Sequence, residues 1–390
     1  MYQVKLFNKI SNAGLELLDP AKYTHSEDFD SYDAVMVRSA KLHDTAFPES
    51  LKCIARAGAG VNNIPIDRCS EEGIVVFNTP GANANAVKEL VICGLLLASR
   101  NILGGIQWTR ELAGNGDAIP SMAEKGKSKF AGPELKGKTL GIIGLGAIGA
   151  RVANAADAMG MNVVGYDPYL SVDAALQITR SLKHVTELDE LFKAADYITV
   201  HVPALPSTTG IICKENIEKM KDGVRIVNFA RGELVAEDDI IEALKSGKVA
   251  AYVCDFASEK MLAAPNAICM PHLGASTPES EDNCAKMAAQ EIMDYLEKGI
   301  IRNSVNFPNL KVPREEGAFR RICMIHRNIP HMINRITATI ANHNANIENM
   351  GNRSKGDYAY TIMDTNIEVD DSMLNELKAL EGMISVRVIL

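Results

Sequence analysis

The sequence predicts an α/β protein with two doubly wound parallel-sheet domains and a small βαββαβ domain at the C-terminal end. Three observations carry this prediction. The first hundred residues alternate short apolar runs with helical stretches, and a second series of β-α units extends from Thr139 to about residue 270. After a segment rich in proline and charge, the remaining residues follow the order β-α-β-β-α-β. A chain of 390 residues accommodates two or three domains of the usual size.

The composition is that of an ordinary globular protein and excludes several classes of function. Hydrophobic residues make up 47% of the chain, charged residues 23%, and the net charge is −8, so we expect no nucleic-acid partner. No apolar run reaches the length needed to span a bilayer, and the first residues lack the pattern of a signal peptide. The eight cysteines form no CxxC pair, which predicts reduced thiols, a cytoplasmic location and no bound metal.

The first domain is expected to be discontinuous, covering residues 1–98 and 282–305. Its strands are predicted from short apolar runs, and a helix follows before a stretch rich in glycine and lysine. An amphipathic helix near residues 278–298 brings the chain back to this domain. The apolar runs lie at 4–7, 34–37 and 74–77.

The second domain is expected to cover residues 99–281, followed by a linker and a third domain. Two prolines, a glycine and mixed charges make residues 306–317 the best linker candidate in the sequence. In the third domain, residues 318–390, the strand RICMIH precedes a helix with isoleucines at helical spacing. A turn at Lys355-Gly356-Asp357 joins two further strands, and a polar helix and the strand ISVRVIL complete a ferredoxin-like unit.

The segment TLGIIGLGAIGARVANAADAMG has the pattern of a Rossmann-like dinucleotide site. An apolar strand runs into Gly144-x-Gly146-x-x-Gly149 and an alanine-rich helix, whose N-terminus offers free N–H groups to a pyrophosphate. The three glycines permit a tight turn, close approach of the backbone to the ligand, and close packing of helix and strand. A second strand ends at Asp167, 18 residues after Gly149, where a carboxylate accepts from both ribose hydroxyls and repels a 2′-phosphate. The sequence therefore predicts NAD as cofactor and disfavours NADP.

Polar side chains end three further apolar strands of the second domain. The carboxyl ends of parallel strands meet at one edge of the sheet, where ligands bind. Hydride transfer needs a cation to bind and polarise a carbonyl, and an acid/base to move the hydroxyl proton; Arg231 and His272 supply these groups. Glu259 is the candidate carboxylate for orienting His272. Each residue alone has an ordinary structural explanation, but their combination predicts a dehydrogenase site. The three segments are HVPALPSTTG at 201–210, RIVNFARGELV at 225–235 and ICMPHLGAST at 268–277.

The motifs GLGAIG, YDP, HVP, NFARGELV and PHLGAST, in this order, resemble those of the D-isomer-specific 2-hydroxyacid dehydrogenases over nearly the whole chain. The resemblance implies that the first domain binds substrate and the second binds NAD. It also implies that Arg231 binds the substrate carboxylate and carbonyl and that His272 is the general acid/base. The residues it implies at the cofactor are Gly144, Gly146, Ala147, Ile148, Gly149, Asp167, Phe229, Ala230, Arg231, Asp255, His272, Leu273, Gly274 and Ala275.

The resemblance also assigns Glu259 as the catalytic carboxylate beside His272, but with an altered spacing. The common pattern D-V-F-x-x-E places the acid five residues after the aspartate, whereas Glu259 follows Asp255 by four residues in CDFASEK. Either one residue is deleted, which shifts the carboxylate, or Glu259 aligns and the aspartate is displaced to Asp255.

Substrate binding is implied at the strand ends of the first domain. Arg38 and Lys41 in VRSAKL and Arg56 in RAGAGV supply cations for the anionic substrate. The loop containing Gly60 and Val61 offers backbone N–H groups to the same ligand. An alternative is that the three cations are ordinary surface residues.

A C-terminal ACT-type regulatory domain is implied by the segment IHRNIPHMINRITATIANHNANI. His326, Asn328 and Asn346 match the spacing of a serine site at the edge of two paired modules, which predicts L-serine as a possible effector. The alternative is that Asn328 caps a helix and Asn346 lies in a turn. His331 stands where the family usually has glycine, and its side chain could fill that site.

The family resemblance implies an activity, the NAD-dependent oxidation of 3-phospho-D-glycerate to 3-phosphohydroxypyruvate, which is the entry step of serine synthesis. Another 2-hydroxy acid, such as 2-hydroxyglutarate, glycerate or phosphoerythronate, is an alternative substrate, and a non-catalytic NAD(H)-sensing regulator is an alternative of another class. A homodimer or homotetramer is implied. The region of Trp108 and Arg110 lies at the dimer interface in such dehydrogenases, although Trp108 could equally belong to a core.

Overall fold

The computed structural model describes residues 1–314 and 320–389. Its internal contacts divide the chain into a first unit, residues 1–83 with 278–390, and a second unit, residues 84–277. Each unit contains a parallel sheet, and the first unit also contains a smaller antiparallel sheet. The α/β class predicted from the sequence is confirmed.

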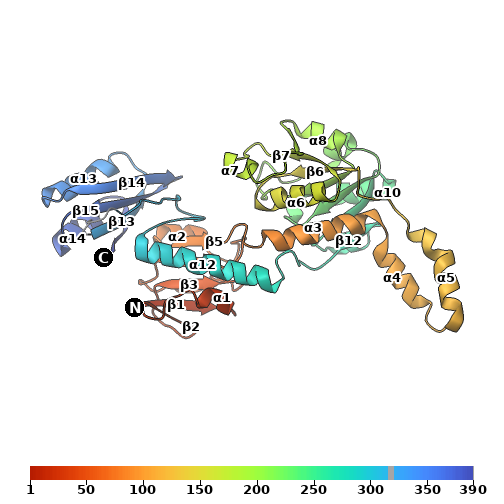
Figure 1. Cartoon of the computed structure of the whole chain (residues 1–390). Coiled ribbons are helices and arrows are strands. Elements are labelled where there is room, and N and C mark those ends of the chain that lie inside the picture. The colour runs from red at the N-terminus through yellow and green to blue at the C-terminus, as the bar shows by residue number, and fades with distance from the viewer. Residues whose placement is uncertain (315–319, 390) are drawn as a thin grey trace. The chain divides into compact units, whose positions relative to one another are not determined.

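The parallel sheet of the first unit has five strands in the order β2-β1-β3-β4-β5 (Figure 1). Both faces are buried, as is usual for parallel sheets, so the strands are apolar at successive positions. Ala34 and Met36 pack on the face covered by α12, and Val35 and Val37 pack on the opposite face. The elements are β1 (Tyr2–Phe7), α1 (Asn12–Leu15), β2 (Tyr23–Ser26), β3 (Ala34–Val37), β4 (Cys53–Arg56), α2 (Ile66–Glu71), β5 (Val75–Asn78) and α12 (Pro278–Lys298).

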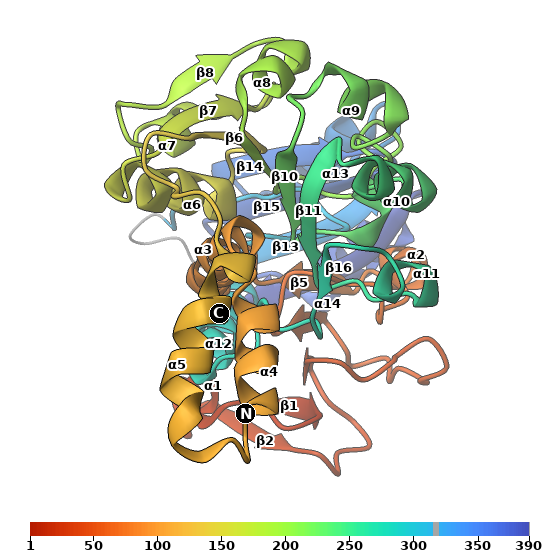
Figure 2. The ribbon, with the colours of Figure 1, turned by 90° about the vertical axis from the view of Figure 1, so that its right-hand side faces the viewer.

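The parallel sheet of the second unit has seven strands in the order β12-β11-β10-β9-β6-β7-β8 (Figure 2). The strand order reverses between β6 and β9, the place where doubly wound sheets form a ligand crevice at the strand carboxyl ends. Helices α3 (Ala84–Ser99) and α6 (Ala147–Ala158) contribute to the core on one face. Helices α8 (Leu188–Ala194), α9 (Lys214–Lys219) and α10 (Glu237–Ser246) contribute to the core on the other face. The strands are β6 (Thr139–Ile143), β7 (Asn162–Tyr166), β8 (Lys183–Val185), β9 (Tyr197–Val200), β10 (Val224–Asn228), β11 (Val249–Cys254) and β12 (Ala267–Cys269).

Helix α3 packs within the second unit, whereas the sequence analysis placed the domain boundary after it. Val87, Val91 and Leu95 of α3 share a core with Leu140 and Ile142 of β6. The helices are α3 (Ala84–Ser99), α4 (Ile102–Glu111), α5 (Ile119–Gly126), α6 (Ala147–Ala158), α7 (Val172–Ala175), α8 (Leu188–Ala194), α9 (Lys214–Lys219), α10 (Glu237–Ser246) and α11 (Glu259–Leu262).

The C-terminal part has the predicted βαββαβ order, and its antiparallel sheet has the strand order β14-β15-β13-β16. Gly356, with φ of 58°, makes the predicted turn between β14 and β15. His331 lies directly before the helix α13 (Met332–Asn342) and has a left-handed backbone conformation, with φ of 64°. Glycine adopts this conformation more easily than other residues, which explains why it suits this position better. The elements are β13 (Arg320–Arg327), α13 (Met332–Asn342), β14 (Ile347–Lys355), β15 (Tyr358–Thr365), α14 (Asp371–Ala379) and β16 (Met383–Ile389).

Both faces of the C-terminal sheet are buried. Ile322 and Met324 of β13 face α13 and α14, whereas the alternate residues Cys323 and Ile325 join the core formed by α12 and the first sheet. The segment predicted as a linker, 306–317, takes part in this packing, because its side chains at 307, 310 and 312 are buried. Residues 315–317 of that segment, and 318 and 319 of the predicted third domain, lie outside the described residues.

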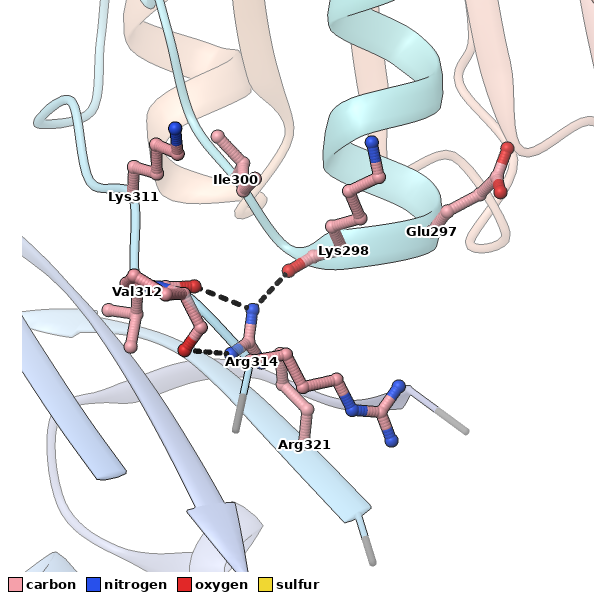
Figure 3. Close-up of a pocket in the computed structure, with 8 residues that line it drawn as sticks. Glu297, Lys298, Ile300, Lys311, Val312, Arg314 and Arg321 are labelled. Atoms are coloured by element: carbon pink, nitrogen blue, oxygen red, sulfur yellow. Dashed lines mark hydrogen bonds between the residues drawn. The ribbon is translucent and has the colours of Figure 1, made fainter. Parts of the chain in front are cut away.

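Arginine side chains fasten the C-terminal sheet to the end of α12. The guanidinium of Arg321 donates to both carboxylate oxygens of Asp364 at 2.7 and 2.8 Å, and to the carbonyl oxygens of Lys298 (2.9 Å) and Val312 (3.0 Å), beside a cavity of about 120 Å³ (Figure 3). Arg387 donates to two further carbonyls near the end of α12 at 2.6 and 3.1 Å. Cations at a helix C-terminus interact favourably with its unpaired carbonyls.

A buried carboxyl group on α12 predicts a dependence of stability on pH. Burial raises the pKa of Glu291 from 4.5 to about 8, although a hydrogen bond from Asn303 opposes this. The folded state therefore binds more protons than the unfolded state between these two pH values. The contribution of Glu291 to the free energy of unfolding is thus fully present below pH 4.5 and is lost as the pH rises through 8. We expect the free energy of unfolding of Glu291→Gln, relative to that of wild type, to increase by more than about 1.4 kcal/mol from pH 5 to pH 9. Urea denaturation at both pH values measures this, and equal profiles would contradict it.

Candidate active site

The glycine-rich loop of the second unit connects β6 to α6, and each of its three glycines has a structural reason. Gly144 has φ of 93°, and a Cβ there would lie 2.8 Å from the carbonyl oxygen of His201. A Cβ on Gly149 would lie 1.9 Å from the carbonyl oxygen of Gly144, so helix and strand pack too closely for any side chain. A Cβ on Gly146 would meet no atom within 4 Å. This loop leaves open space where a pyrophosphate would approach.

Asp167 lies beside this loop at the end of β7. Its Oδ2 accepts from the backbone N–H of Leu145 at 2.9 Å and its Oδ1 from that of Tyr169 at 2.9 Å. Each carboxylate oxygen has further lone pairs to accept from ribose hydroxyls. Gly146 caps α6 without a side-chain hydrogen bond, so the first N–H groups of the helix have no capping side chain. The loop, the helix N-terminus and the carboxylate fit a dinucleotide such as NAD.

The HVP motif contributes a buried, uncharged histidine rather than a charged group. His201 follows β9, and its Nε2 lies 3.0 Å from the hydroxyl of Thr199. Burial lowers the pKa of this histidine from 6.5 to about 3, so it stays neutral at physiological pH. Its backbone carbonyl is the atom that would contact a side chain at position 144.

The loop after β10 presents Phe229, Ala230 and Arg231. Arg231 is exposed, and its Nη1 donates to the carbonyl of Ala230 at 2.7 Å. The fully buried Asn228 holds the loop, because its Nδ2 donates to the carbonyl of Arg231 at 2.8 Å and its Oδ1 accepts from the N–H of Ala230 at 3.1 Å. Asn228 was not among the residues predicted from the sequence; the available signal was a polar residue at the end of a strand.

His272 lies beside Asp255 at the neighbouring strand ends. Its Nδ1 is 2.9 Å from Oδ2 of Asp255, whose side chain is fully buried, while the imidazole is 60% exposed. The ring of Phe256 lies against the imidazole, with centroids 5.6 Å apart. The loop continues through Leu273, which is exposed, Gly274, which is buried, and Ala275. A neutral histidine in this setting can accept a proton from a bound hydroxyl.

Glu259, which the sequence analysis assigned to orient His272, begins the short helix α11 and is exposed. The preceding Ser258 caps this helix by accepting from the N–H of Met261 at 3.1 Å and donates to the carboxylate of Glu237. The carboxylate at Nδ1 of His272 is therefore that of Asp255, which the sequence analysis assigned to the cofactor.

Two of the three cations predicted to bind substrate lie in contact at the strand ends of the first unit. Arg38 follows β3 and Arg56 ends β4; the Nε of Arg56 donates to the carbonyl of Arg38 at 3.0 Å. Arg38 also forms a half-exposed ion pair with Glu281 of α12 at 2.7 Å, so a substrate anion would compete with this carboxylate. Lys41 is exposed nearby along the chain, and Gly60 and Val61 are half-buried in the loop after β4.

The predicted effector residues are not brought together within one chain. His326 is only 2% exposed; its Nδ1 lies 2.9 Å from the carbonyl of Arg327 and its Nε2 2.9 Å from the hydroxyl of Thr361. Burial lowers the pKa of His326. Asn328 is exposed after β13, and Asn346 is exposed before β14, at the other end of the sheet. The strand rise places these ends roughly 24 Å apart.

The described residues hold neither a metal-binding cluster nor a single membrane-spanning helix. Across residues 1–314 and 320–389, no group of three or more His, Cys, Asp and Glu side chains could hold a metal ion. In the same residues no single helix is long and apolar enough to cross a membrane; one pair, α3 with α4, passes by length and composition but is bent by 66°.

Residues 93–274 match the NAD binding domain of the D-isomer specific 2-hydroxyacid dehydrogenases, and residues 322–382 match the ACT domain. The second unit thus contains the NAD-binding domain of a dehydrogenase. The chain belongs to the D-isomer-specific 2-hydroxyacid dehydrogenase family and carries an ACT domain in its C-terminal part.

Curated relatives and solved structures agree with this family. D-3-phosphoglycerate dehydrogenase of Methanocaldococcus jannaschii is 42% identical over 274 residues, which are 69% of this chain and 49% of that protein. The chain thus spans about half the length of the curated relatives it matches. NAD+-bound 3-phosphoglycerate dehydrogenase of Entamoeba histolytica is 29% identical with a TM-score of 0.62, covering 79% of this chain and 99% of that one. A glyoxylate reductase of Paecilomyes thermophila is also 29% identical, with a TM-score of 0.64 and coverage of 78% and 98%.

Proposed function

We propose that the protein is an NAD-dependent dehydrogenase that oxidises 3-phospho-D-glycerate to 3-phosphohydroxypyruvate, the first step of L-serine biosynthesis. The observation that carries the choice of substrate is the identity of 33–42% to curated relatives named D-3-phosphoglycerate dehydrogenase. The solved structures do not choose between substrates, because a glyoxylate reductase is equally similar in sequence. Free thiols at all eight cysteines agree with a cytoplasmic enzyme.

The residues at the strand ends of the second unit supply the chemistry. Arg231 pairs with the substrate carboxylate and polarises the developing carbonyl at C2. His272 accepts the hydroxyl proton of C2 at Nε2, because its Nδ1 faces Asp255. When bound, NAD provides the hydride acceptor. The glycine loop and Asp167 hold the cofactor, and the carboxylate of Asp167 disfavours a 2′-phosphate.

The cations of the first unit are assigned to the anionic groups of the substrate. Arg38 and Lys41 follow β3, and Arg56 ends the adjacent strand β4. Three cations match a phosphorylated acid better than an acid without a phosphate. Lys41 is exposed, so its ammonium group is accessible to a phosphate, and Gly60 and Val61 offer backbone N–H groups.

A panel of four acids tests this substrate against its alternatives. The protein is mixed with NAD and 3-phospho-D-glycerate, 2-hydroxyglutarate, glycerate or phosphoerythronate, and NADH is followed by absorbance. We expect the highest kcat/KM with 3-phospho-D-glycerate, and a clear loss with glycerate, which lacks the phosphate. A higher kcat/KM with another acid would reassign the substrate, and no turnover with any acid would favour the NAD(H)-sensing regulator.

The ACT domain is assigned a small-molecule effector, which we propose to be L-serine. Asn328 and Asn346 lie at opposite ends of one sheet, so a shared serine site takes Asn346 from a second copy of the chain. His326 is buried, so it can contact serine only if its ring gives up the hydrogen bond to Thr361 and bonds to serine in its place. Millimolar L-serine is expected to raise the melting temperature and slow turnover. The absence of both effects would rule out serine as the effector.

A homodimer is proposed through the helical hairpin α4–α5, whose two helices lie side by side in Figures 1 and 2. No residue of α4 is buried, and Leu103 and Ile106 are each 49% exposed. Trp108 packs inside the hairpin against Phe130, with ring centroids 5.4 Å apart. The exposed apolar side therefore faces a second copy.

Ile106→Glu is expected to convert the dimer to a monomer, because it places a charge within an apolar interface. Size-exclusion chromatography with light scattering measures the mass. Leu17→Glu is the matched control, since Leu17 is 44% exposed on the first unit and should leave the mass unchanged. A wild-type protein that is already monomeric, or an Ile106→Glu protein of dimer mass, would contradict the assignment of the hairpin.

A further inference from the structure

We propose that Asp255, and not Glu259, is the carboxylate that positions the imidazole of His272 for proton transfer. The inference deepens the proposed function and rests on it for the identity of the reaction. It assigns Asp255 a role in orienting the general base in addition to its expected place at the cofactor.

The sheet itself brings these two residues together. Cys254 and Cys269 are register partners on the adjacent parallel strands β11 and β12, and their sulfur atoms are 3.7 Å apart. Asp255 follows Cys254 directly, and His272 follows Cys269 by three residues. The contact therefore depends on the pairing of β11 with β12, which sets where the two chain segments leave the sheet.

The contact is also well shielded from water on the side of the aspartate. The side chain of Asp255 is fully buried, and its Oδ2 lies 2.9 Å from Nδ1 of His272. A Cβ built on Gly274 would lie 3.9 Å from the same Oδ2, so the loop after His272 encloses the carboxylate. In the described part of the chain neither oxygen of Asp255 accepts a well-aligned hydrogen bond. A buried carboxylate in this state is stabilised by the nearby Nδ1–H of His272, and further by the imidazolium that forms when Nε2 takes up a proton.

Glu259 has a different structural role. It lies in the first turn of α11, where an acidic side chain interacts favourably with the helix N-terminus. Its neighbour Ser258 ties this turn to α10 through Glu237. The shortened spacing between Asp255 and Glu259 thus places the later acid on an exposed helix, while the earlier acid stays at the strand end.

The consequence for catalysis is a defined tautomer. A carboxylate at Nδ1 holds the proton on that atom, so Nε2 carries the lone pair that accepts a proton from the substrate hydroxyl. The O–H bond breaks as the N–H bond forms, and the resulting imidazolium is stabilised by the charge of Asp255. Phe256 limits rotation of the ring, since it lies against the imidazole.

Matched truncations, Asp255→Ala and Glu259→Ala, separate the two carboxylates. Nitrogen-15 NMR of labelled histidine, with the His272 signal assigned from a His272→Ala spectrum, reports the tautomer in the protein without substrate. We expect wild type and Glu259→Ala to carry the proton on Nδ1, and Asp255→Ala to lose this preference. Asp255→Asn, which keeps the shape and removes the charge, serves as the second variant if the alanine variant does not fold.

Kinetics with 3-phospho-D-glycerate give the second readout. Asp255→Asn is expected to lower kcat by about 10²–10⁴-fold with KM within about threefold, and Asp255→Glu to recover part of the loss. Glu259→Ala is expected to change kcat by less than about threefold. A large loss in Glu259→Ala, or an Nδ1 proton retained in Asp255→Ala, would overturn the inference. Because NMR needs no turnover, failure of the proposed reaction alone would leave the tautomer of His272 unchanged, so the two failures are distinguishable.

Discussion

Alanine in place of His272 is expected to lower kcat for oxidation of 3-phospho-D-glycerate by about 10²–10⁴-fold, the usual contribution of a general acid/base. The imidazole lies with Nδ1 at Asp255, which leaves Nε2 as the proton acceptor. Removing it leaves the hydroxyl proton to bulk water, while Arg231 still binds the carboxylate. The loss should therefore appear in kcat, with KM changed much less.

Steady-state rates of NADH formation measure this effect. The matched control is His25→Ala, because His25 is an exposed histidine on β2 of the first unit. NAD binding, followed by calorimetry, should be similar in wild type and both variants. If His272→Ala turned over within a few-fold of the control, another group would have to accept the proton.

Alanine in place of Arg321 is expected to destabilise the protein by about 3–5 kcal/mol, because it leaves a buried carboxylate without its cation. The side chains of Arg321 and Asp364 are 2% and 0% exposed and form a bidentate pair. The substitution also removes hydrogen bonds to carbonyls at the end of α12 and in the segment that follows it.

Chemical denaturation of Arg321→Ala beside Arg320→Ala isolates this effect. Arg320 precedes Arg321 on β13, but its partner Glu368 is exposed, so we expect the control to lose only about 0–1 kcal/mol. Equal stability of the two variants would contradict the role assigned to the buried pair. A loss confined to the C-terminal sheet would show that this sheet unfolds separately from the first one.

Much of the fold could be predicted from the sequence because its signals are local. The apolar runs that became β3, β5 and β6 are short and bounded by turns, and parallel strands are apolar at successive positions. The glycine pattern was equally informative, because the positive φ of Gly144 is a local backbone feature and the close contact of Gly149 is with Gly144, a few residues before it. These features require no knowledge of distant contacts.

The parts that could not be predicted depend on long-range packing. The contact between Asp255 and His272 follows from the register of β11 and β12, which no local pattern specifies. The C-terminal sheet was expected to be a separate module after a linker, but alternate residues such as Cys323 pack into the core of the first sheet. That Asn328 and Asn346 lie at opposite ends of the sheet within one chain likewise follows from strand pairing and not from their spacing in the sequence.

The central claim, oxidation at C2 of a phosphorylated hydroxy acid, is tested most directly by isotope transfer. The full chain is incubated with NAD and 3-phospho-D-glycerate that carries deuterium at C2, and the reduced cofactor is analysed by mass spectrometry. Hydride transfer from C2 predicts NADH that contains one deuterium, in wild type but not above background in His272→Ala. No reduced cofactor, or reduced cofactor without deuterium, would contradict oxidation at C2.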